Sequence, residues 1–93
     1  MASKPGEERY VKVPAGPKFW ELLNIIFTDE FMKKYTNFEA FEYFRYSSAV
    51  MTTWTGEYMV YQEEVFNNFV KESTQFATWD EMIMKAADEK FEK

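Results

Sequence analysis

Residues 38–46 (FEAFEYFRY) place five aromatic rings within nine positions, as expected of a stacking platform for bases, a docking surface for a partner or the packed side of a helix. A strand would turn alternate side chains to opposite faces, and both faces of this run would then carry charge. A helix instead gathers the apolar positions on one broad face and leaves Glu39, Glu42 and Arg45 on the other. The pattern therefore predicts a helix over residues 37–53. Its expected inward side chains are Ala40, Phe41, Tyr43, Phe44, Ser47, Ser48, Val50 and Met51.

The composition of the whole chain also favours helices. Its 93 residues include ten Phe, six Tyr and three Trp, but only three Gly and three Pro, too few for a fold built from hairpin turns. A chain of this length forms one domain with a single modest core. We therefore expect an all-α fold, a small irregular bundle of four to five helices with an extended N-terminal arm. The expected division is a flexible arm over residues 1–9 and a single helical domain over residues 10–93.

The remaining helices are predicted from apolar periodicity and from end signals. Besides residues 37–53, the expected helical segments are residues 18–27, 28–36, 57–73 and the stretch from residue 78 onward. Residues 28–36 form either a short helix or a bent continuation of the helix before them. Val60 is the one position in the segment 57–73 that does not fit its amphipathic pattern. Trp54, in the break before that segment, is expected to cover the core from a loop.

Two shorter patterns complete the survey of the chain. Residues 10–17 are expected to be extended, with Val11 and Val13 turned to one side. Residues 37–41 and 78–82 share the order cap, aromatic, acid, any residue, apolar. We interpret this likeness as the general start of an amphipathic helix rather than as a sign of two related halves.

The chain contains no His and no Cys, which removes most catalytic and metal-binding chemistry. Without these residues no Ser–His or Cys–His nucleophile system can form, and the usual zinc sites are excluded. Glu39 and Glu42 share a helical face, but Arg45 follows at the same spacing, which favours a solvated ion-pair strip over a catalytic dyad. We therefore expect no enzymatic activity, no cofactor and no metal ion.

The formal charge of −5 and the pI near 4.7 bear on partners and on location. An acidic surface repels phosphate backbones and anionic lipids, so we expect neither nucleic acid nor a membrane as partner. No stretch approaches the length of about 18 apolar residues that a membrane span needs. The first ten residues are polar and lack the apolar core of a signal peptide. Together with the absence of Cys, these features predict a cytoplasmic protein.

The surplus of rings and methionines predicts a partner-binding surface. Nineteen aromatic residues and six Met exceed what a core of this size is expected to bury, and both kinds of side chain are enriched at interfaces. The expected partner-binding residues are Tyr46, Tyr61, Val60, Tyr35, Arg45 and Glu42. Tyr46 is the strongest candidate, because the helical pattern places it among charged residues and away from the core. Tyr46 and Tyr61 lie on neighbouring predicted helices, so a cluster of the two is geometrically allowed.

These observations predict a non-enzymatic protein-interaction or regulatory module whose partner is another protein or a second copy of the chain. The alternative is an acidic inhibitor or decoy that occupies a basic nucleic-acid-binding cleft of another protein. That alternative requires one contiguous carboxylate face, for example Glu39, Glu42, Glu63 and Glu64. A third hypothesis is a small-molecule binder with an aromatic pocket, for which a domain this small has little spare volume.

Overall fold

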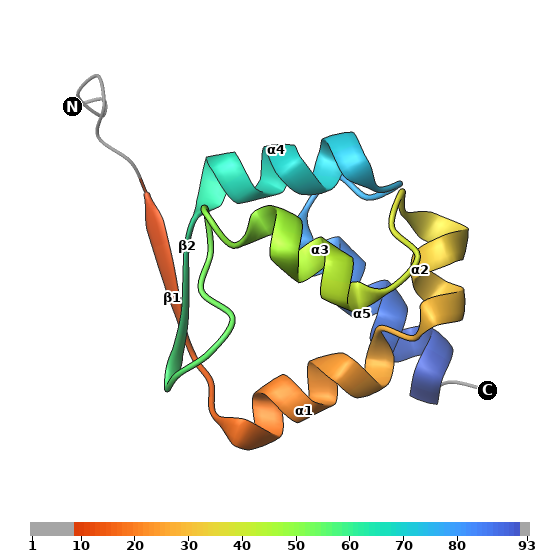
Figure 1. Ribbon diagram of the computed structural model, residues 1–93. Helices are drawn as coiled ribbons and strands as arrows, with labels where there is room; N and C mark the ends of the chain where they lie inside the picture. The colour runs from red at the N-terminus through yellow and green to blue at the C-terminus, as the bar shows by residue number, and fades with distance from the viewer. Residues whose placement is uncertain (1–8, 92–93) are drawn as a thin grey trace.

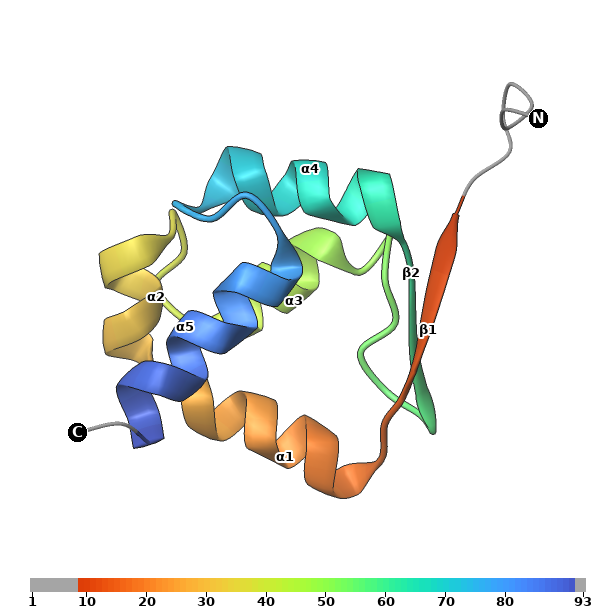
Figure 2. The same ribbon diagram turned by 180° about the vertical axis from the view of Figure 1, so that it is seen from behind.

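The computed structural model describes residues 9–91, and within this range the chain forms five helices and a two-stranded antiparallel sheet (Figures 1 and 2). The elements in order are β1 (Tyr10–Pro14), α1 (Pro17–Ile26), α2 (Asp29–Tyr35), α3 (Phe41–Ser48), β2 (Tyr58–Gln62), α4 (Glu63–Ser73) and α5 (Trp79–Phe91). The predicted all-α class is therefore wrong, and the domain is a small mixed α/β fold. Its five helices lie within the predicted range. Of the predicted N-terminal arm, residues 1–9, only Arg9 belongs to the described residues.

The helices enclose the core from several sides, and the sheet closes one end. Figure 1 shows α3 in front of α5, with α4 above and α1 below, and Figure 2 shows the same arrangement from behind. The strands β1 and β2 lie side by side at one end of this box, and α2 lies at the opposite end. One face of the two-stranded sheet therefore lies against the helices, and only the opposite, outer face is exposed.

The segment predicted as the start of a helix over residues 57–73 is instead the strand β2, which leads directly into α4. Side chains along β2 alternate: Met59 and Tyr61 are buried, and Val60 between them faces the outer side. Both buried residues lie opposite the valines of β1, Val11 and Val13, which share one side as expected. Because β1 is distant in the sequence, periodicity within residues 57–73 could not reveal this pairing.

The helix predicted over residues 37–53 is also shorter than expected, because a turn precedes it. Thr36 organises that turn: its Oγ1 donates to the Met32 carbonyl (2.7 Å) and accepts from the Phe38 N–H (2.9 Å). The threonine ends α2 and turns the chain, so α3 begins only at Phe41. Side-chain to backbone bonds of this kind compete with helix formation.

Thr74 makes the same pair of bonds at the end of α4. Its Oγ1 donates to the Val70 carbonyl (2.7 Å) and accepts from the Phe76 N–H (3.0 Å). The two turns also bind each other, because the backbone N–H groups of Asn37 and Gln75 each donate across to the other half at 2.9 Å. The bond acceptors are the carbonyls of Ser73 and Tyr35 respectively.

The two turns thus form a structural repeat in which a threonine is followed by a residue with an amide side chain and then by a phenylalanine, at residues 36–38 and 74–76. Each phenylalanine crosses to the opposite half, where Phe38 stacks on Phe69 (6.1 Å between centroids) and Phe76 on Phe31 (5.9 Å). The equivalent positions are 36–41 and 74–79, a register that the comparison of residues 37–41 with 78–82 missed.

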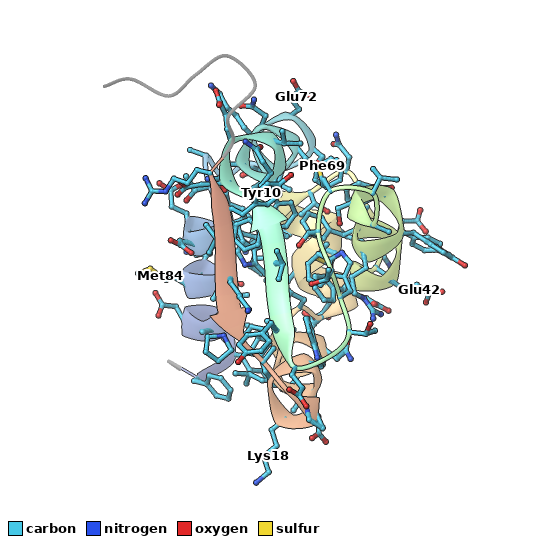
Figure 3. The ribbon with its side chains drawn as sticks, turned by 90° about the vertical axis from the view of Figure 1, so that its left-hand side faces the viewer. Tyr10, Lys18, Glu42, Phe69, Glu72 and Met84 are labelled. Atoms are coloured by element: carbon cyan, nitrogen blue, oxygen red, sulfur yellow. The ribbon has the colours of Figure 1, made fainter. Side chains whose placement is uncertain are left out.

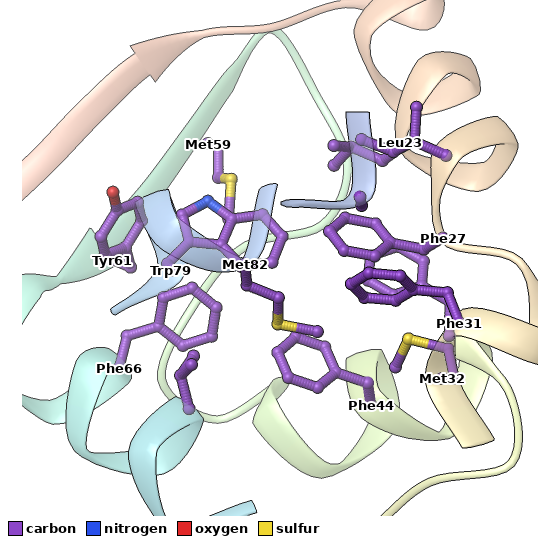
Figure 4. Close-up of a cluster of buried hydrophobic side chains, with 14 residues drawn as sticks. Leu23, Phe27, Phe31, Met32, Phe44, Met59, Tyr61, Phe66, Trp79 and Met82 are labelled. Carbon is purple, nitrogen blue, oxygen red and sulfur yellow. The ribbon is translucent and has the colours of Figure 1, made fainter. Parts of the chain in front are cut away.

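Trp79 lies at the centre of a core built from large rings (Figure 4). Its ring centroid is 5.3 Å from that of Phe66, 5.6 Å from Phe27 and 6.0 Å from Phe44. Aromatic pairs at such distances each contribute about 0.5–1.5 kcal/mol beyond the burial of their area. Fully buried methionine side chains fill the spaces between the rings: Met32, Met59 and Met82.

Candidate functional site

The two most exposed large apolar side chains among residues 9–91 belong to α3 and the turn that follows it. Tyr46 is 77% exposed and Val50 is 91% exposed, and Tyr43, one turn before Tyr46, is 52% exposed. Tyr43 and Tyr46 lie three residues apart on one side of α3, and Val50 lies in the turn that follows the helix. We call these three residues the α3 ridge.

The exposure of Tyr43 and Val50 corrects the prediction that both face the core. The inward side of α3 consists of only three buried residues: Phe41, Phe44 and Ser48. Phe41 and Phe44 are inward as predicted, but the helix contacts the core along this narrow stripe alone. Because α3 ends at Ser48, Val50 lies in a turn and no longer follows the helical pattern.

A groove of about 370 Å³ runs along the flank of α3, beside the ridge. Its lining residues are Glu42, Arg45, Tyr46, Ala49, Trp54 and Thr55; we call this site the α3 groove. Three of the six predicted partner-binding residues, Tyr46, Arg45 and Glu42, thus meet in one place. Figure 3 shows Glu42 on the outer edge of the molecule, on α3 and away from the strands.

Trp54 forms a rigid floor for the α3 groove. Its indole Nε1–H donates to the Ser48 Oγ (3.0 Å), which in turn donates to the Phe44 carbonyl (2.8 Å). The indole ring also packs edge-on against core rings, with Phe41 and Trp79 both at 5.6 Å. Sequence reasoning placed Trp54 over the core but missed that its accessible side lines a groove.

Arg45 is held over an aromatic ring and has no ionic partner in the described part of the chain. Its guanidinium carbon lies 5.3 Å from the Phe41 ring centroid, a cation–π arrangement. The Arg45 Nε is buried and makes no hydrogen bond to any described residue. The ion pairs found within residues 9–91 do not include one between Arg45 and Glu42, although the two lie one helical turn apart. The predicted ion-pair strip on this face is therefore not formed.

The other three predicted residues lie elsewhere. Tyr61 is only 6% exposed and packs on Phe66 (5.1 Å), so the expectation that it is exposed on a helix beside Tyr46 is wrong. Burial raises the pKa of the Tyr61 hydroxyl, and the Asp80 and Glu63 carboxylates raise it further. Val60 lies on the outer face of the sheet. No cluster of Tyr46 with Tyr61 exists.

Tyr35 lies between α2 and α5, where its hydroxyl donates to the Glu89 carboxylate. This hydrogen bond is the main cause that lowers the pKa of Glu89; Lys34 and Lys85 lower it further, and desolvation opposes the change. An adjacent hollow of about 350 Å³ contains two carboxylates and two lysines. Its lining is Ile26, Thr28, Glu30, Phe31, Lys34, Ala86, Glu89 and Lys90. The opposing charges balance, and no single ligand chemistry is favoured there.

The outer face of the sheet is a second exposed surface, and it faces the viewer in Figure 3. On it, the Lys12 ammonium lies over the Tyr58 ring at 4.4 Å, and Val60 is paired with Lys12 across the strands. The edge of β1 carries Lys12 and Pro14 within five residues, and both residue types discourage the addition of another strand. The α3 groove is therefore the better formed of the exposed surfaces.

No helix within residues 9–91 has the length and apolar character needed to cross a membrane. Among these residues there is also no group of three or more Asp or Glu side chains that could hold a metal ion. Comparison with known proteins gives no relative: no family model, no curated protein and no solved structure matches the chain. The geometry of the α3 groove is therefore the basis for proposing a function.

Proposed function

We propose that the chain is a non-enzymatic protein-interaction module, a small adaptor or regulatory domain that docks its partner at the α3 groove. The observation that supports this proposal is the convergence of Arg45, Tyr46 and Trp54 in one groove. Trp, Tyr and Arg are the residue types that carry most of the binding energy at protein interfaces. A ring exposed as fully as Tyr46 has no role in the core.

The groove is also fixed before any partner arrives. Trp54 is bonded to Ser48 and wedged among core rings, and Arg45 is stacked on Phe41. Side chains that are already immobilised lose little conformational freedom on binding, and each one saves about 0.5–1.5 kcal/mol of ordering. A preformed groove with an exposed ring at its rim suits recognition of a protein surface.

None of the three other hypotheses receives comparable support. A carboxylate dyad, the catalytic option left without His and Cys, needs two acids, and the α3 groove contains only Glu42. The acidic decoy requires one contiguous carboxylate face, and in the example given, Glu39, Glu42, Glu63 and Glu64, the Glu63 carboxylate is paired with Arg9 (3.2 Å). The small-molecule hypothesis requires an enclosed aromatic pocket, whereas the α3 groove is open to solvent along α3.

Site-specific photo-cross-linking tests the proposal. A benzophenone amino acid replaces Tyr46 in one variant and Met84 in the control variant, because Met84 is 64% exposed but lies on α5. We expect discrete cross-linked products from position 46 in cells and few from position 84. Equal labelling from both positions, or none from position 46, would contradict docking at the α3 groove.

A further inference from the structure

We infer that the partner at the α3 groove is a second copy of this chain, with the two α3 helices antiparallel about a twofold axis. The inference rests on the proposed function, because it names the occupant of the same surface. A twofold interface joins a patch to itself, so the patch must contain both members of every contact. The α3 groove and the α3 ridge meet this requirement in charge and in shape.

The charges of the α3 groove are self-complementary. Glu42 and Arg45 have opposite charges, line the same groove and form no ion pair with each other. Across a twofold axis, Glu42 of one copy meets Arg45 of the other, and the reciprocal pair forms at the same time. The groove is neutral overall, whereas the whole chain has a formal charge of −5. Two acidic molecules can thus approach here without a net repulsion between the facing charges.

The apolar contacts fit the same axis. A twofold axis that pairs Glu42 of one copy with Arg45 of the other passes midway between these two residues, at position 43.5 in the residue numbering. An axis that pairs Tyr43 with Tyr46 passes at 44.5. The two midpoints differ by one residue, or about 1.5 Å of helical rise, which side chains of this length can absorb. The α3 ridges of the two copies then contact each other through Tyr43 and Tyr46, and the two α3 grooves face each other beside them.

The size of the surface indicates a transient association. The eight residues of α3 span only about 12 Å along the helix axis. The interface therefore belongs to the small class below about 1,200 Å², which is typical of transient complexes. We expect a reversible dimer whose population rises with protein concentration, not a permanent one.

Charge reversal combined with mixing tests the inference. Wild type, Glu42→Arg and Arg45→Glu are measured by sedimentation equilibrium from about 10 μM to 1 mM, a range that brackets weak association. Each variant alone should remain monomeric at concentrations at least tenfold above those at which the wild type dimerises. An equimolar mixture of the two variants should restore the dimer, because it opposes two arginines to two glutamates. Restoration would not follow if either substitution had only unfolded the domain.

Glu72→Arg is the matched control for Glu42→Arg. It changes the net charge by the same amount as Glu42→Arg, but from an exposed position on α4. Figure 3 shows Glu72 and Glu42 at separate edges of the molecule. The control should dimerise at least as well as the wild type. A wild type that stays monomeric throughout, or a mixture that stays monomeric, would overturn the second copy as occupant. Cross-linking of position 46 to a different protein would then still support the proposed function, whereas its absence would remove both.

Discussion

Removing the Ser48 hydroxyl should loosen the floor of the α3 groove and destabilise the domain. Ser48 is fully buried, and its Oγ is the acceptor of the Trp54 indole N–H. In Ser48→Ala that N–H has no described acceptor. A buried donor left without a partner costs about 1–3 kcal/mol. Trp54 is half-buried, so water can replace part of the bond, and we expect a loss of about 1–2 kcal/mol in the free energy of unfolding.

Ser73→Ala provides a control with nearly the same geometry. Ser48 and Ser73 are the last residues of α3 and α4, and each donates to the carbonyl four residues before it, at 2.8 and 2.7 Å. Only Ser48 also accepts a bond from an indole. Both substitutions gain the same helix propensity from Ala. The difference between the two variants therefore isolates the bond to Trp54.

The assay is urea unfolding followed by far-ultraviolet circular dichroism. We expect Ser48→Ala to be less stable than Ser73→Ala by about 1 kcal/mol, which corresponds to about 4–8 °C in the thermal midpoint of a domain this size. Equal losses in the two variants would show that the bond to Trp54 contributes nothing. The α3 groove would then not be held in place by Ser48, which would contradict a preformed site.

Three further predictions concern other parts of the fold. Thr36→Val and Thr74→Val should each lower the unfolding free energy by about 1–2 kcal/mol in the same assay, because the two threonines make equivalent bonds; a neutral effect in one alone would contradict the repeat. Tyr35→Phe should raise the pKa of Glu89, measured by carbon-detected NMR titration. A carboxyl group whose pKa is lowered by folding stabilises the fold at pH values above its pKa in the unfolded chain, and this stabilisation is lost as the pH falls through its pKa in the folded chain. The loss of stability in acid should therefore be shallower in Tyr35→Phe than in the wild type. Gly56→Ala should lower the free energy of unfolding by about 1 kcal/mol, measured by thermal unfolding. An added Cβ would meet nothing within 4 Å, but φ at this glycine is +100°, a conformation that residues other than glycine rarely adopt.

The ends of α1 and α2 and the buried positions of α5 follow from the sequence. Pro17 begins α1, one residue before the predicted helix over residues 18–27, and Thr28 caps α2 by accepting from the Phe31 N–H (3.0 Å). The buried residues of α5 are Trp79, Met82 and Ala86, which lie three and four residues apart in the sequence. These features depend on neighbours within one or two turns, so local periodicity and capping chemistry are sufficient to find them.

The sheet could not be predicted, because its strands are joined by contacts between distant segments. The local signs were the extended segment with Val11 and Val13 on one side, and Val60, which fits a strand better than the helix proposed for it. The candidate site was predicted in part: Glu42, Arg45 and Tyr46 share one helical flank and therefore meet. The prediction for Tyr61 was wrong because its segment is a strand and not a helix. Trp54 lines the groove only because its loop folds back over α3, which local periodicity does not reveal.

The central claim, that a second copy docks at the α3 groove, is tested most directly by a dilution series of amide NMR spectra. The account predicts concentration-dependent shifts that concentrate at residues 42–55, with little change on the outer face of the sheet around Tyr58. Spectra that do not change with concentration, or shifts centred on the sheet, would contradict it.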